Sequence, residues 1–238
     1  MNKILEERYA EVLADIDPSF LDHEVAKSRK LSTPFLVSGP LDPGARKIMV
    51  IGREFGGDGW RIKCGGGPML YVTEALNRHR VFYSKQMAKK KMDRGVTFFN
   101  FMRTLGARFG HEGLIYSNLL CIDSEGKDPS KSEHFSSIKL LSKRLLDVQL
   151  DCFKPDAIIF ANGASTVSVR REFFPINGKD KVCKNLRNWE EYGIAKDHLW
   201  EFELLDKFRC YRIQHPATVK GRVQAEAARR HLLEVLAI

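Results

Sequence analysis

The chain contains little of what marks metal-binding, secreted or membrane proteins. Its 238 residues include five cysteines, none in a Cys-x-x-Cys pair, so no zinc ribbon or iron–sulfur cluster has a recognisable ligand set. Glu6 and Glu7 interrupt the amino terminus where a secretory signal needs an apolar core, and no later stretch could span a bilayer. We therefore expect a cytoplasmic monomer with reduced thiols, no membrane association, and no metal or other cofactor.

Two phosphate-binding signatures are also missing. The chain has no Gly-x-x-x-x-Gly-Lys-Ser/Thr loop and no convincing Gly-x-Gly-x-x-Gly fingerprint. These absences count against a Rossmann-like enzyme that handles free nucleosides or nucleotides, although that function stays an alternative.

The chain has fewer acidic than basic residues. The chain has 39 Lys and Arg against 30 Asp and Glu, a formal net charge of +9. This excess suits a polyanionic partner such as DNA, although a solvated basic surface would give the same composition.

Four short apolar runs predict the strands of an α/β fold. The first run lacks polar alternation, which indicates a strand with helices over both faces of its sheet. An amphipathic segment at 132–150 fits a β-α-β crossover, and further helices are predicted at 4–16 and 222–236. We expect a three-layer α/β/α fold around a short, four-stranded, mostly parallel sheet, with strands at 48–51, 114–116, 157–160 and 210–213.

The whole chain, 1–238, is predicted to form one domain. The segment at about 56–96 is rich in Gly and Lys and is too long for a simple strand-to-helix connection, so we interpret it as an insertion that lines a site. The segment 171–207 fits either a second insertion or irregular helix.

Polar or glycine residues follow each predicted strand, where ligands bind in open parallel sheets. The first and last endings are Gly52-Arg53-Glu54-Phe55-Gly56 and Gln214-His215-Pro216-Ala217; the others are Ser117-Asn118 and Ala161-Asn162-Gly163. These four endings, in this order, resemble the uracil-DNA glycosylase superfamily, in which the archetypal first and last endings are Gly-Gln-Asp-Pro-Tyr and His-Pro-Ser-Pro-Leu. The resemblance implies a fold of that type.

The resemblance also implies catalytic roles that suit the chemistry. Breaking an N-glycosidic bond produces an oxocarbenium-like sugar and an anionic base. Glu54 would stabilise the cation and activate water, His215 would donate a hydrogen bond to the leaving base, and Asn118 would read the base edge. The alternatives are a Glu54 carboxylate paired with Arg53 and a structural His215.

Further residues would hold the DNA and the flipped base. Val219 would fill the gap left by the extruded nucleotide, unless it is an ordinary loop valine. Lys220 and Arg222 would contact phosphates of the DNA. Lys89 and Lys90 would also bind phosphates, unless they simply form a charged surface exposed to solvent. Candidates for stacking on the base are Phe55, Phe82 and Tyr83, whereas the cluster Phe98, Phe99 and Phe101 fits helix packing.

The substrate is predicted from one difference between this sequence and the archetypal one. Gly56 replaces the archetypal tyrosine that excludes C5-substituted bases, so we expect a C5-modified pyrimidine, such as a hypermodified phage base, at least as readily as uracil. No lysine stands out as a Schiff-base nucleophile, which predicts a monofunctional glycosylase of DNA repair or phage defence. A non-catalytic nucleic-acid-binding module of the same fold is the main rival.

Overall fold

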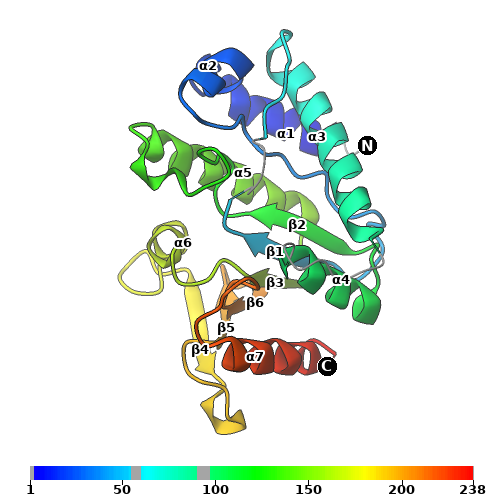
Figure 1. Ribbon diagram of the computed structural model, residues 1–238, viewed down its shortest axis with the longest axis vertical. Helices are drawn as coiled ribbons and strands as arrows, with labels where there is room; N and C mark the ends of the chain where they lie inside the picture. Colours follow the sequence, from blue (N-terminus) through cyan, green and yellow to red (C-terminus); the bar gives the residue numbers. More distant parts are fainter. Residues whose placement is uncertain (1–2, 55–59, 90–96, 238) are drawn as a thin grey trace. The chain divides into compact units, whose positions relative to one another are not determined.

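The computed structural model describes residues 3–54, 60–89 and 97–237 (Figure 1). The chain divides into two compact units, each built from three segments. Unit 1 comprises Met1–Gly39, Arg53–Lys85 and Asn118–Lys154, and unit 2 comprises Pro40–Gly52, Gln86–Ser117 and Pro155–Ile238. The single-domain interpretation stays a prediction.

An open, mostly parallel sheet forms the centre of unit 2. It has six strands in the order β2-β1-β3-β6-β5-β4. The strands are β1 (Ile48–Gly52), β2 (Leu114–Asn118), β3 (Ala157–Phe160), β4 (Cys183–Asn188), β5 (Leu199–Leu204) and β6 (Phe208–Ile213). The predicted α/β class and all four predicted strands are confirmed.

Parallel pairing joins β1, β3 and β6. Ile51 pairs with Phe160, and Phe160 pairs in turn with Arg212, so the three strands end at one edge of the sheet. Every residue of β1 and β3 is buried; for β1 this agrees with the missing polar alternation of its sequence.

The sheet has six strands rather than the predicted four, because β4 and β5 both lie in the ambiguous segment 171–207. They pair antiparallel with each other, and β5 pairs antiparallel with β6. β4 reads CKNLRN and is largely exposed at the sheet edge, while β5 carries two glutamates. An edge strand is held by backbone pairing, so its sequence need not contain the apolar run that marks a buried strand.

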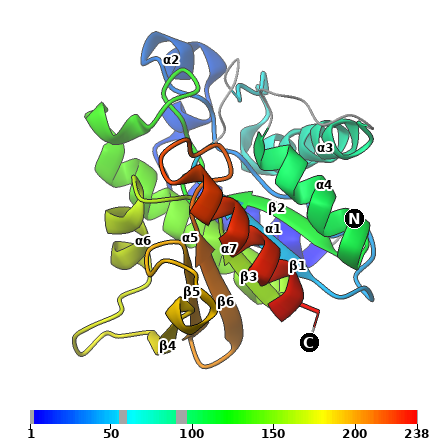
Figure 2. The same cartoon turned by 60° about the horizontal axis from the view of Figure 1, so that its bottom comes forward.

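Three helices belong to unit 2: α4 (Thr97–Phe109), α6 (Val167–Phe173) and α7 (Arg222–Val235). The short helix η3 spans Glu190–Tyr192. α7 contacts β5 and β6 (Figure 2), and buries Ala228 and Leu232.

Unit 1 is helical. It contains α1 (Lys3–Ala14), η1 (Pro18–Phe20), α2 (His23–Ser28), η2 (Pro129–Lys131), α5 (Phe135–Phe153) and most of α3 (Gly67–Met87). α1 packs on α5, where Arg8 Nη2 lies 3.0 Å from Asp151 Oδ2. α3 occupies much of the predicted insertion, and in the described part of the chain no helix is long and apolar enough to cross a membrane.

All five cysteines are free thiols. Cys121, Cys183 and Cys210 are buried, whereas Cys64 and Cys152 are half-buried.

Candidate functional site

The turns that follow β3 and β6 touch each other in unit 2. Gly163 has a φ of +69°, and a Cβ built on it would lie 3.1 Å from the Cβ of His215. Glycine therefore meets two local demands, a left-handed backbone and a close neighbour. This contact brings together two of the strand endings that the sequence analysis singled out.

The imidazole of His215 is oriented by its own turn. Its Nδ1 accepts a hydrogen bond of 3.1 Å from the Ala217 backbone N–H, and the Thr218 N–H donates to the His215 carbonyl at 2.8 Å. A neutral ring whose Nδ1 accepts carries its proton on Nε2. His215 is thus set up as an Nε2–H donor.

Phe98 of α4 lies beside this imidazole. The two ring centroids are 6.1 Å apart and tilted by 31°, and Phe98 also lies 5.4 Å from the ring of Tyr116. Sequence reasoning assigned Phe98 to helix packing, because residue spacing cannot show which ring of an aromatic cluster reaches a strand end. Its position makes this half-buried ring a candidate for stacking on a ligand.

Asn162, at the end of β3, is a polar residue whose role the sequence analysis missed. Its side chain is fully buried, and neither Nδ2 nor Oδ1 has a hydrogen-bond partner among the described residues. An unpaired buried amide costs about 1–3 kcal/mol. Such a group at a strand end is a candidate for binding a ligand that supplies the missing partners.

Glu54 belongs to unit 1 and follows the end of β1 by two residues. Its side chain is only 3% exposed, with Oε1 lying 3.3 Å from Arg53 Nη2. The other oxygen, Oε2, is buried and has no hydrogen-bond partner among the described residues. Glu54 therefore forms the ion pair with Arg53 through Oε1, and Oε2 takes no part in it.

Burial raises the pKa of Glu54, and the nearby carboxylates of Asp128 and Asp123 raise this pKa further, against the opposing effect of Arg53. Asp123 is itself fully buried, and its own pKa is raised by burial. A buried carboxylate with a raised pKa is typical of a general base. Sequence reasoning missed Asp123 because it lies in an irregular segment beyond β2.

Asn118 is the last residue of β2 and is 6% exposed. The chain after it is tied to the Glu54 loop of unit 1, because the Leu120 N–H donates to the Arg53 carbonyl at 2.8 Å. Tyr83 is 5% exposed within α3, and its ring stacks on His79 at 6.1 Å, which is a packing role.

The predicted DNA-binding residues of unit 2 lie at the surface. Val219 is 85% exposed, and Lys220 and Arg222 are exposed beside it. Arg222 Nε lies 2.7 Å from the carboxylate of Glu226. Lys89 follows the end of α3, whereas Phe55, Gly56 and Lys90 lie outside the described residues.

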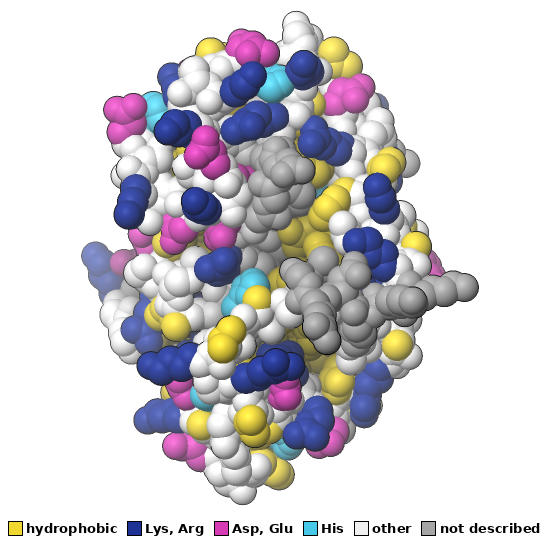
Figure 3. Space-filling model, viewed as in Figure 1, with side chains coloured by type: hydrophobic (Ala, Val, Ile, Leu, Met, Phe, Trp, Pro, Cys, Tyr) yellow, Lys and Arg dark blue, Asp and Glu magenta, His cyan; other side chains and the backbone are white. Residues whose placement is uncertain are grey.

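Lys and Arg side chains are spread over the face in Figure 3, with acidic side chains among them, rather than gathered into one patch. Within the described residues, no group of three or more His, Cys, Asp or Glu could hold a metal ion. The fold and site define an α/β protein with polar residues at the carboxyl ends of its parallel strands. No protein-family model matches the chain, and no curated protein matches it either.

Gly163→Ala tests the contact between the two turns. We expect the left-handed φ to cost about 1 kcal/mol and crowding against His215 to add roughly another 1–3 kcal/mol, measured by urea unfolding. Gly178→Ala is the matched control, because its φ is +83° and its added Cβ would meet nothing within 4 Å. Equal losses in the two variants would contradict the contact.

Glu54→Gln tests whether the ionised carboxylate of Glu54 lowers the stability of the folded protein. Because the folded state raises the pKa of Glu54, stability falls as pH rises from the ordinary value of 4.5 through the folded pKa. We expect the variant to unfold at higher urea concentration than wild type at pH 7, with the difference vanishing below the ordinary value.

Glu226→Gln is the control of opposite sign. Arg222 lowers the pKa of Glu226, so this variant should lose stability at neutral pH and converge with wild type in acid. A Glu54→Gln protein less stable than wild type at pH 7 would show that the pair with Arg53 is structural.

Proposed function

We propose that this protein is a monofunctional DNA glycosylase with a three-layer, uracil-DNA-glycosylase-like fold. The observation that carries the proposal is His215, a neutral Nε2–H donor placed by its turn against Gly163, where β3 and β6 end. A fixed donor at a strand end suits the stabilisation of an anionic leaving group better than a freely rotating one.

In this proposal the C1′–N bond breaks, and its electron pair leaves with the base. The Nε2–H of His215 would donate to the base carbonyl next to the departing nitrogen. Asn118 would read the base edge, and Asn162 would use its buried amide, which has no partner among the described residues, for a further contact with the base. Phe98, rather than Tyr83, would stack on the base, because Tyr83 already packs on His79.

Glu54 would act on the sugar. Its ionised carboxylate would stabilise the oxocarbenium and take a proton from water as the oxygen attacks C1′, leaving an abasic site. Two observations support this role: Oε2 has no hydrogen-bond partner among the described residues, and the pKa of Glu54 is raised.

DNA is the proposed partner, and the base is proposed to be a C5-modified pyrimidine at least as readily as uracil, in repair or phage defence. The exposed Val219 would occupy the gap of the extruded nucleotide, with phosphates on Lys220 and Arg222.

The direct test uses oligonucleotides that contain uracil, 5-hydroxymethyluracil, 5-hydroxymethylcytosine, its glucosylated form or only ordinary bases, followed by alkali. We expect cleavage at one class of test base, reduced by roughly 10²–10³-fold in His215→Ala and at least as strongly in Glu54→Gln. Glu11→Gln, on the exposed face of α1, should keep wild-type activity. Salt-dependent DNA binding without excision of any base would support the non-catalytic module instead.

Asn162→Ala separates a ligand-binding amide from a structural one. Because the amide has no partner to lose among the described residues, the unfolding free energy should fall by no more than about 1 kcal/mol. Excision should fall at least tenfold because the base loses its contacts. A large loss of stability with wild-type excision would contradict the assignment.

A further inference from the structure

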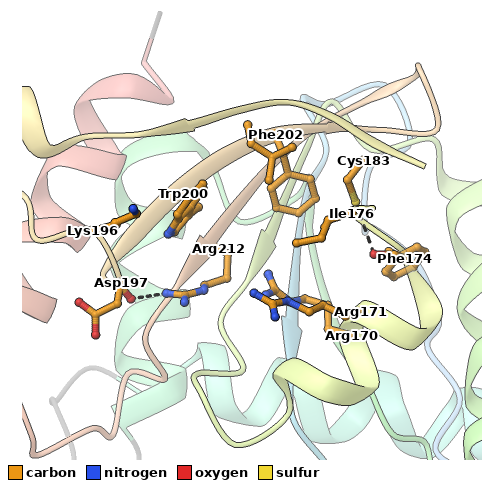
Figure 4. Close-up of a pocket in the computed structure, with 11 residues that line it drawn as sticks. Arg170, Arg171, Phe174, Ile176, Cys183, Lys196, Asp197, Trp200, Phe202 and Arg212 are labelled. Atoms are coloured by element: carbon orange, nitrogen blue, oxygen red, sulfur yellow. Dashed lines mark hydrogen bonds between the residues drawn. The ribbon is translucent and has the colours of Figure 1, made fainter. Parts of the chain in front are cut away.

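Unit 2 contains a cavity that is lined by none of the candidate site residues named above. It has a volume of about 300 Å³ and is bounded by α6 and the β4–β5–β6 part of the sheet (Figure 4). We call it the arginine cavity; its lining residues are Arg170, Arg171, Phe174, Ile176, Cys183, Leu186, Lys196, Asp197, Trp200, Phe202 and Arg212.

The lining of the arginine cavity carries a large excess of positive charge. Asp197 is its one carboxylate, against three guanidinium groups and Lys196. Arg212 donates through Nη1 to the Asp197 backbone carbonyl rather than to its side chain. Among the described residues, neither Arg170 nor Arg171 has a carboxylate within ion-pair distance, and Arg170 Nε is buried without an acceptor.

This arrangement is unfavourable without a ligand. The pKa of Arg170 is lowered to about 10 by burial and by repulsion from Arg212 and Arg171. Four cationic side chains held together with only the Asp197 carboxylate among them destabilise the folded state, and an anion bound there would relieve both the repulsion and the missing hydrogen bond of Arg170 Nε.

Aromatic rings share the same face of the sheet. Arg212 pairs across strands with Trp200 on one side and Phe160 on the other, so these side chains form one row. Phe202 lies two residues from Trp200 on the same strand face, and its ring is nearly parallel to Phe160 at 5.8 Å. Figure 4 shows Trp200 and Phe202 above the guanidinium ends of Arg170, Arg171 and Arg212.

The positive charge and the aromatic rings of the arginine cavity together indicate which class of ligand it binds. A phosphate monoester carries a charge of about −1.5 to −2 at pH 7, which matches the guanidinium cluster better than a singly charged carboxylate or internal phosphodiester. Arginine forks bind phosphate oxygens in pairs, and an indole offers a flat surface to a planar ring. A cavity of about 300 Å³ suits a small ligand.

We propose that the arginine cavity binds a nucleoside 5′-monophosphate group, with its phosphate on Arg170, Arg171 and Arg212 and its base against Trp200. The group has two possible sources, a free nucleotide or the 5′-phosphorylated end of a DNA strand. The proposal is independent of the glycosylase assignment, because no residue of the arginine cavity takes part in that chemistry.

Calorimetry and tryptophan fluorescence of the full chain test the proposal with thymidine 5′-monophosphate, thymidine and inorganic phosphate as probes. We expect the nucleotide to bind at least tenfold more tightly than thymidine or phosphate alone, with a change in fluorescence. Trp200→Phe should remove most of that change while calorimetry still detects binding. Equal affinity for nucleotide and thymidine, equal affinity for nucleotide and inorganic phosphate, or no binding would each overturn the proposal.

Arg171→Gln and Arg212→Gln should each weaken nucleotide binding at least tenfold. Arg171 is exposed on α6, so Arg171→Gln should fold and report on binding even if Arg212→Gln does not fold. The matched control is Arg230→Gln, an exposed arginine of unit 2 outside the cavity, which should bind as wild type does. Unchanged binding in a folded Arg171→Gln protein, or an equal loss in Arg230→Gln, would contradict the assigned site.

Competition identifies the source of the ligand. Displacement of the nucleotide by a 5′-phosphorylated oligonucleotide, but not by its 5′-hydroxyl counterpart, supports a DNA end. Displacement by neither oligonucleotide supports a free nucleotide. Displacement by both equally would show that internal phosphodiesters suffice, which overturns the monoester assignment.

Discussion

Parallel pairing of β1, β3 and β6 is the constraint on which the remaining structure depends. Hydrogen bonding keeps Ile51, Phe160 and Arg212 in one row, and it continues past the end of β3, where the Ala161 N–H donates to the Ile51 carbonyl at 2.9 Å. Three parallel strands that end in register must be followed by turns at one edge. The contact between Gly163 and His215 is a direct result.

Buried polar groups without protein partners recur in both units. Glu54 and Asp123 each keep a buried oxygen without a hydrogen-bond partner among the described residues, as do both amide atoms of Asn162 and the Nε of Arg170. Each such group lowers stability unless something outside the chain satisfies it. Their positions, after strands and around one cavity, are where ligands of α/β proteins are found.

The sequence predicted the elements whose burial leaves a regular pattern. The continuous apolar runs of β1 and β3 and the amphipathic period of α5 were sufficient, since each reflects contact with a core. β4 was not found, because backbone hydrogen bonds hold an edge strand with little regard to side chains. β5, which lies between β6 and β4, was not found because its two glutamates interrupt the apolar run. The same reasoning located Glu54, Asn118, Asn162 and His215 at strand endings, but it gave Asn162 no role and did not find Phe98 or Asp123.

By itself, the sequence determined the α/β class, the positions of four strands along the chain and the polar residues that follow them, because these depend on neighbours along the chain. Only the tertiary structure decided which groups lack partners, which tautomer His215 adopts and which arginines converge. The arginine cavity shows the reason: Arg170 and Arg212 are far apart in sequence, and their shared burial exists only after α6 and β6 have packed. Electrostatic repulsion and desolvation depend on distances in space, which no local pattern of residues contains.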